Sequence, residues 1–203
     1  IYRRKGPWAI MAIRDYLMRQ MYNENPIHEL KQLRSINDIS VFADATRIKC
    51  DPNQTDGKWV ELPDPVVTEL TAAVDVVIQM GFGLLEGRIL TEPEYGLLSF
   101  HYGDVTEYRG APSGFWEYID GAEHTKVTVQ QLTATLDGGK VVTTSDVDLS
   151  TALTWDDVRG RLFDTSIPML ATAIKQFEDP DFEPEPPQAD ESVVLGDVDH
   201  RLE

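Results

Sequence analysis

A histidine and an aspartate in the middle of the sequence each follow an expected strand, at the start of a loop or turn. His101 follows the apolar run 97–100, and Asp137 begins an Asp-Gly-Gly turn after the stretch 126–132. An imidazole with an ordinary pKa of ~6.5 can move a proton or hydrogen-bond a developing negative charge near neutral pH. A carboxylate nearby orients the ring and favours its protonated form. The two side chains are therefore candidates for acid–base chemistry at one site.

Several patterns predict the elements that position these two residues. The runs 97–100, 126–132 and 140–149 predict strands, and Pro112 predicts a helix start because proline fits the first helical turn. Residues 65–73 predict a helix. Residues 74–80 predict a strand buried on both faces, since they are nearly all apolar and β-branched. Strand ends of this kind are where open α/β sheets place their chemistry.

The two ends of the chain show other patterns. Towards the N-terminus we expect helices over 7–23 and 28–33 and a strand over 40–43. Thr154 with Asp157 resembles a capping box at a helix start, and Pro168 should divide the following helical stretch into two helices. Residues 179–203 are rich in proline and acidic residues, which predicts a tail outside a domain that spans 1–178.

Three short motifs and one longer stretch carry a resemblance to a known family. The motifs are Ser99-Phe100-His101, Tyr108-Arg109-Gly110-Ala111-Pro112 and Leu136-Asp137-Gly138-Gly139, and the longer stretch is 75–86. In order and spacing they resemble the formyltransferase family that uses 10-formyltetrahydrofolate, whose members include methionyl-tRNA formyltransferase and glycinamide ribonucleotide formyltransferase. The resemblance covers about residues 60–150. One position departs from the family pattern, because Ser99 stands where the family has a catalytic Asn.

The resemblance implies an α/β, Rossmann-like formyltransferase domain with a mostly parallel central sheet. Such a domain begins with a strand, a Gly-rich turn and a helix, and residues 1–60 show no such pattern. The chain also begins with Ile rather than Met. We therefore expect that the first βαβ unit lies upstream of this sequence.

The resemblance also implies roles for individual residues. His101 would handle the proton or polarise the formyl group, with Asp137 as its partner and Ser99 as a weakened hydrogen-bond donor. The strand-to-turn segment 81–85 would line the folate pocket, although it could be a simple turn. The loop after His101 would face the acceptor, although Arg109 could equally belong to a surface turn. The implied folate-binding residues are Gly81, Phe82, Gly83, Leu84, Leu85 and Leu136, and the implied substrate-binding residues are Tyr108, Arg109 and Gly110.

These roles imply formyl transfer from 10-formyltetrahydrofolate to an amine acceptor. The acceptor would be a small molecule such as an amino sugar or a nucleotide, with methionyl-tRNA as a further option. Two alternatives stay open. One is a formyltetrahydrofolate hydrolase, in which water is the acceptor; the other is a degenerate domain that binds folate or a partner without catalysis. Ser99 favours the degenerate domain, whereas His101 and Asp137 favour an enzyme.

The composition restricts the kinds of molecule that this protein can bind. The formal net charge of −17 opposes binding to nucleic acid, whose affinity rests on basic patches. No apolar run approaches the ~20 residues that cross a membrane. The lone Cys50 excludes an internal disulfide and favours a reducing, cytoplasmic setting, and no Cys/His set has metal-ligand spacing. The acidity fits either a halophilic protein or an ordinary acidic one, and thermal melting in molar KCl would distinguish the two.

Overall fold

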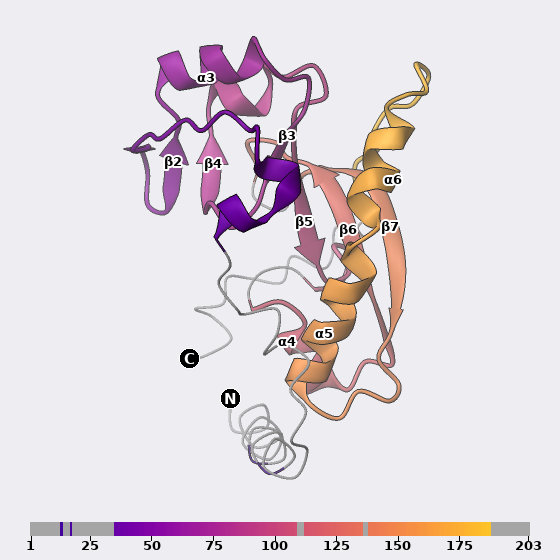
Figure 1. The fold of residues 1–203 in the computed structure, drawn as a ribbon. Coiled ribbons are helices and arrows are strands. Elements are labelled where there is room, and N and C mark those ends of the chain that lie inside the picture. Colours follow the sequence, from indigo (N-terminus) through magenta and orange to yellow (C-terminus); the bar gives the residue numbers. More distant parts are fainter. Residues whose placement is uncertain (1–12, 14–16, 18–34, 109–111, 136–137, 188–203) are drawn as a thin grey trace.

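The computed structural model describes residues 13, 17, 35–108, 112–135 and 138–187 of the 203-residue chain. Two small sheets form its centre, and helices α5 and α6 lie along β6 and β7 (Figure 1). In chain order the elements, with η denoting a 3-10 helix, are η1 (Ile36–Asp38), η2 (Ser40–Phe42), β1 (Asn53–Gln54), β2 (Trp59–Glu61), α3 (Asp64–Thr71), β3 (Val77–Gln79), β4 (Leu84–Glu86), η3 (Arg88–Leu90), β5 (Leu97–Tyr102), α4 (Phe115–Asp120), β6 (His124–Gln131), β7 (Lys140–Asp148), α5 (Trp155–Ser166) and α6 (Met169–Gln176).

The larger sheet has the strand order β3-β5-β6-β7. Strand β5 runs parallel to β3 and antiparallel to β6, and β6 runs antiparallel to β7. The smaller sheet has the order β1-β2-β4, with β2 parallel to β4. The α/β class is confirmed. Over the described residues, however, the larger sheet is mixed, whereas the sequence led us to expect a mostly parallel one.

Side-chain alternation along β5 and β6 separates two apolar clusters. Val127 and Val129 of β6 and Leu98 of β5 are fully buried in the larger cluster, which α5 and α6 cover. The smaller cluster lies on the opposite face of β5, because it includes Leu97 rather than Leu98. Its other members come from β4, η3, α3 and the segment before α3, so it joins the small sheet to the large one.

Two local signals set the ends of the C-terminal helices, as the sequence predicts. The Thr154 hydroxyl accepts from the Asp157 N–H at 3.1 Å, and the Asp157 carboxylate accepts from the Thr154 N–H at 2.8 Å. This reciprocal pair satisfies donors that a helix start otherwise leaves unpaired. Helix α5 ends at Ser166, and α6 begins after Pro168.

Several predictions for the first 80 residues differ from the structure or lie outside the described residues. The strand expected over 40–43 is wrong, since Ser40–Phe42 form a 3-10 helix whose residues are all exposed and pair with no strand. The strand expected over 74–80 is shorter, and Val77–Gln79 are half-buried because β3 is an edge strand of the described sheet. The helices expected over 7–23 and 28–33 lie outside the described residues, apart from positions 13 and 17. No helix of the described residues is long and apolar enough to span a bilayer.

Helix α4 meets α5 through a glycine. Gly114, which precedes α4, has a φ of +67°, and a Cβ there would lie 2.7 Å from the side chains of both Val158 and Leu162. Gly121, which follows α4, has nearly the same φ of +68°, but nothing lies within 4 Å of its Cβ position. The two glycines therefore separate the cost of backbone strain from the cost of overpacking.

We expect Gly114→Ala to destabilise the protein more than Gly121→Ala. The left-handed backbone costs a residue with a Cβ roughly 1–2 kcal/mol at either site, and overpacking adds roughly 1–3 kcal/mol at position 114 alone. Urea unfolding of both variants measures the difference. Equal losses of stability would show that α4 does not pack tightly on α5.

Candidate active site

The polar face of the β5–β6 pair places the candidate residues next to one another. Ser99 and His101 lie on the same face of β5, because they are two residues apart in a strand. Their partners across the ladder are Gln130 for Ser99 and Thr128 for His101. Side chains opposite one another in such a pair have Cβ atoms about 5 Å apart. The register thus assembles four polar side chains into one patch, of which the sequence analysis named only two.

A hydrogen bond to the loop after β5 fixes the orientation of His101. Its Nε2 lies 3.0 Å from the carbonyl oxygen of Tyr108. A carbonyl oxygen only accepts, so Nε2 carries the proton and donates it. In the neutral ring Nδ1 is then the acceptor nitrogen. The loop also folds back on itself, since the Tyr108 N–H donates to the Asp104 carbonyl at 2.7 Å.

A buried carboxylate anchors this loop to β6. Asp104, which is 8% exposed, accepts from the Thr106 N–H and hydroxyl at 2.9 and 2.6 Å and pairs with the Lys126 ammonium at 2.7 Å. Burial by itself would raise the pKa of Asp104, but Lys126 and Thr106 together lower it below its usual value. The same contact raises the pKa of Lys126. Both groups therefore stay charged near neutral pH, and the anchor persists.

A second acid, Glu117 of α4, lies directly behind the histidine loop. It is 2% exposed, and its Oε1 accepts from the Thr125 hydroxyl at 3.2 Å. A Cβ on Gly103 would lie 2.8 Å from this Oε1 and 3.4 Å from His101 Nε2. Glycine at 103 thus lets the carboxyl, the imidazole and the loop meet. Burial raises the pKa of Glu117 to about 7.

The turn that contains Gly138 and Gly139 returns to the same polar patch. A Cβ on Gly139 would lie 2.9 Å from the Gln131 carbonyl oxygen and 3.0 Å from Gln130 Oε1. Gln130, 6% exposed, is the cross-strand neighbour of Ser99. Gly139 therefore lies beside β6, the strand that pairs with the one carrying Ser99 and His101. Leu136 and Asp137 themselves lie outside the described residues, as do Arg109 and Gly110.

The segment expected to bind folate, residues 81–85, lies partly in an exposed turn and partly in the core. Gly81 and Gly83 have φ values of +69° and +92°, with nothing within 4 Å of either Cβ position, and Phe82 between them is 45% exposed. The Gln79 side-chain amide donates to the Gly83 carbonyl and holds the turn. Leu85 is 6% exposed within the smaller apolar cluster. Its side chain therefore packs in the core, whereas Leu84 is half-buried.

Sequence reasoning missed Glu117, Thr128 and Gln130. The last two alternate with Val127 and Val129, and this period of two could have assigned them to the polar face that carries His101. Nothing in the sequence marks Glu117, because an acid in a short helix is usually exposed. Within 35–108, 112–135 and 138–187, the structure contains no group of three or more His, Cys, Asp or Glu residues that could hold a metal ion.

Comparison with known proteins gives three kinds of match. The family model described as "Formyl transferase" matches residues 54–174. The methionyl-tRNA formyltransferase of Agathobacter rectalis is 30% identical over 156 residues, which cover 70% of this chain and 49% of the relative. The protein of the same name from Lachnospira eligens is 31% identical over 109 residues, covering 53% and 35%. The chain thus spans half or less of the length of these relatives.

Solved structures show a similar fold. Glycinamide ribonucleotide transformylase 1 from Symbiobacterium toebii has a TM-score of 0.54 at 23% identity, and the match covers 62% of each chain. Phosphoribosylglycinamide formyltransferase from Anaplasma phagocytophilum has a TM-score of 0.52 at 15% identity and covers 60% of this chain and 61% of its own. At these identities the likeness concerns the fold.

The raised pKa of Glu117 predicts a pH-dependent stability. Its folded pKa of about 7 exceeds the ordinary value of 4.5, so its contribution is complete below pH 4.5 and is lost as the pH rises to about 7. Glu117→Gln removes this titration. Between pH 4.5 and pH 8 the parent should lose about 3 kcal/mol of unfolding free energy that the variant does not lose.

Urea unfolding at several pH values measures this gain, with Asp120→Asn as the matched control. Asp120 lies on the same helix, is exposed, and is the smallest of the causes that raise the pKa of Glu117. Its neutralisation should leave the pH dependence nearly unchanged. A pH profile of Glu117→Gln that runs parallel to that of the parent would contradict the prediction.

Proposed function

The chain belongs to the formyl transferase family, whose model matches more than half of it, and we propose that it transfers a formyl group from 10-formyltetrahydrofolate to an amine acceptor. The observation that carries the proposal is the polar patch on β5 and β6. It combines an oriented His101 with Ser99 and with the returning Gly138–Gly139 turn. These are the same motifs that carry the family resemblance.

The orientation of His101 assigns a task to each ring nitrogen. Nε2–H is held by the Tyr108 carbonyl, so Nδ1 is the nitrogen left to act on the reactants. In the neutral ring, Nδ1 can accept the proton that the attacking amine must lose. Once protonated, Nδ1–H can hydrogen-bond the negative charge that develops on the formyl oxygen. Collapse of the intermediate breaks the bond between the formyl carbon and the folate nitrogen, and Asp137 would return the amine proton through water to that leaving nitrogen.

Residues of the 81–84 turn fit a flat heterocycle such as the pterin ring. Exposed Phe82 offers an aromatic face, and the open space beside Gly81 and Gly83 lets a ring approach the backbone closely. Leu84 would add an apolar contact, and Leu136 would add another from the Leu136–Gly139 motif. Leu85 has no part in this site, because it is packed in the core. Bound here, the folate would supply the formyl group in an activated form.

The acceptor loop consists of Tyr108, Arg109 and Gly110 in this proposal. A small amine is the acceptor that the charge of −17 favours. Methionyl-tRNA is the substrate class named for the two relatives, and the rest of a longer chain could supply what its binding requires. Hydrolysis of the formyl group is the second candidate, and the exposed turn and the half-buried Ser99 and His101 would allow water to enter. Formate release identifies hydrolysis, formylated amine identifies transfer, and folate binding without turnover identifies a degenerate domain.

We expect His101→Asn to lower formyl transfer by roughly 10²–10⁴-fold, because a positioned acid–base group contributes about that much. Binding of a 10-formyltetrahydrofolate analogue should change far less. The assay follows formylated amine and formate on this chain and on a longer chain that contains it. His124→Asn is the matched control, since His124 is exposed at the start of β6. Equal rates for the two variants would remove His101 from the chemistry.

Ser99 predicts a gain of function. Its hydroxyl is shorter than the amide of the family's Asn, and the loss of one such donor costs roughly 10²–10³-fold elsewhere. Gln130 offers an amide on the same face and could replace part of that donor. We therefore expect Ser99→Asn to raise formyl transfer by roughly 10-fold at saturating folate. A variant no faster than the parent would show that the serine site is already complete.

A further inference from the structure

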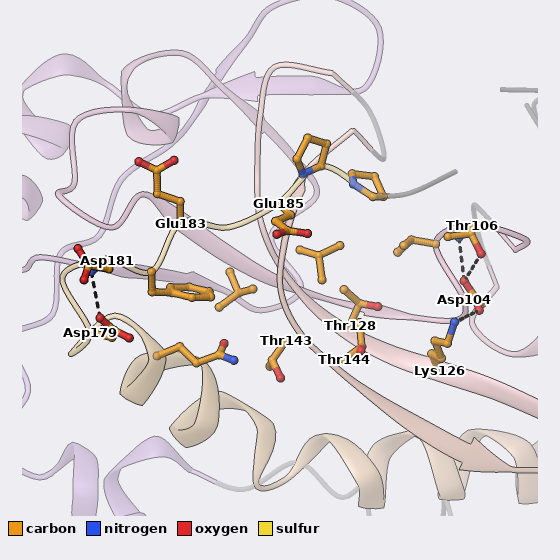
Figure 2. Close-up of a pocket in the computed structure, with 17 residues that line it drawn as sticks. Asp104, Thr106, Lys126, Thr128, Thr143, Thr144, Asp179, Asp181, Glu183 and Glu185 are labelled. Atoms are coloured by element: carbon orange, nitrogen blue, oxygen red, sulfur yellow. Dashed lines mark hydrogen bonds and ion pairs between the residues drawn. The ribbon is translucent and has the colours of Figure 1, made fainter. Parts of the chain in front are cut away.

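A cavity of about 740 Å³ adjoins the polar patch, and Thr128 of the patch lines it whereas Ser99, His101 and Gln130 do not. Its walls are β6, β7, the end of α6, the loop after β5 and residues 179–187. Figure 2 shows Thr128, Thr143 and Thr144 between the Asp179–Asp181 turn at one end and the Asp104–Lys126 pair at the other. The cavity is therefore elongated and predominantly polar.

Residues 179–187 form a fixed wall of this cavity. Glu185 pairs with Val141 at the edge of the sheet through two backbone hydrogen bonds of 2.6 and 3.2 Å. Phe182 packs on Phe177 with ring centroids 5.5 Å apart and adjoins the larger apolar cluster. The segment expected to be a tail thus adds a strand-like edge to the sheet and holds its acidic side chains over the cavity.

Two oxygens that line the cavity lack a hydrogen-bond partner among the described residues. Thr128 is fully buried, and its hydroxyl has no partner. The side-chain oxygen of Gln176 is likewise buried without one, and it can only accept. Buried polar groups are normally paired, so a ligand in the cavity could satisfy these two oxygens.

The charges around the cavity select the sign of the ligand. Among the described residues that line it, Lys126 is the one cationic side chain, and it is paired with Asp104 at 2.7 Å. Four further carboxylates have no cationic partner among the lining residues: Asp179, Asp181, Glu183 and Glu185. The Gln176 oxygen can only accept, the Thr128 hydroxyl can accept as well as donate, and the surrounding side chains carry an excess of negative charge. A phosphate or carboxylate ligand would be repelled, whereas an ammonium group supplies three donors and a positive charge.

We propose that this cavity binds a small organic cation that carries one or more primary ammonium groups. The carboxylates attract the ammonium group, and the Thr128 hydroxyl accepts one of its hydrogen bonds. Gln176 belongs to α6 on the opposite face of the sheet and contributes no contact at Thr128. Thr128 is the ladder partner of His101 on the same face. A ligand that reaches Thr128 therefore ends beside His101. In that position a second amine of the ligand, which must be unprotonated to attack the formyl carbon, would be the acceptor, and this identification rests on the proposed formyl transfer.

The test uses three four-carbon probes that differ in charge: 1,4-diaminobutane, 1,4-butanediol and succinate. Calorimetry without folate, at near-physiological salt, measures each. We expect the diamine to bind at least about 10-fold more tightly than the diol, and succinate not to bind. Equal binding of diamine and diol, or no binding of the diamine, would overturn the proposal.

Variants separate a built site from general attraction to an acidic chain. Thr128→Val keeps the shape and the charge, so it should weaken the diamine about fivefold, as expected for one lost hydrogen bond, without lowering the melting temperature. Asp181→Asn should weaken it roughly threefold. Glu69→Gln is the control, because it makes a similar charge change on exposed α3 outside the cavity. Equal effects of Asp181→Asn and Glu69→Gln, with none from Thr128→Val, would leave only diffuse attraction and overturn the site.

Failure of this site and failure of the proposed function are distinguishable. The binding measurements need no formyl donor. A diamine that binds through Thr128 but is not formylated supports the cavity and contradicts its use as the acceptor site. Formyl transfer to neutral or anionic amines, with the diamine unbound, overturns the cavity and leaves the proposed function intact.

Discussion

The antiparallel register between β5 and β6 is the constraint on which the rest of the structure depends. It sets His101 opposite Thr128 and Ser99 opposite Gln130, and it leaves the valines of β6 in the larger apolar cluster. Because side chains alternate along a strand, a slip of one residue would move the valines out of the larger apolar cluster and the polar groups into it. The stability of the core therefore fixes the geometry of the site.

The loop after β5 is held on that frame by two acids of different character. Asp104 is charged and paired with Lys126, whereas burial raises the pKa of Glu117 to about 7. The first ties the loop to β6, and the second contacts it where Gly103 leaves room. With Tyr108 as acceptor, the loop then fixes the His101 ring. The orientation of His101 thus rests on a loop whose two neighbouring carboxylates belong to no recognised motif.

The acidic segment 179–187 pairs with the edge of β7 and so belongs to the folded sheet. Glu185 reaches Val141, and the segment closes a cavity that leads from its carboxylates towards the strand partner of His101. Composition alone marked these residues as a tail. Because these residues pair with the sheet edge, their carboxylates concentrate negative charge at one wall of the cavity.

The sequence by itself determined the helix start at Thr154, the break at Pro168, the strand that carries His101 and the family, because these signals are local or are short fixed motifs. It misjudged Ser40–Phe42, where apolar residues lack a neighbouring strand. Only the tertiary structure decided which polar residues share the face of His101 and why Glu117 is buried. Cross-strand register and long-range burial depend on residues far apart in the chain, and no local pattern encodes them.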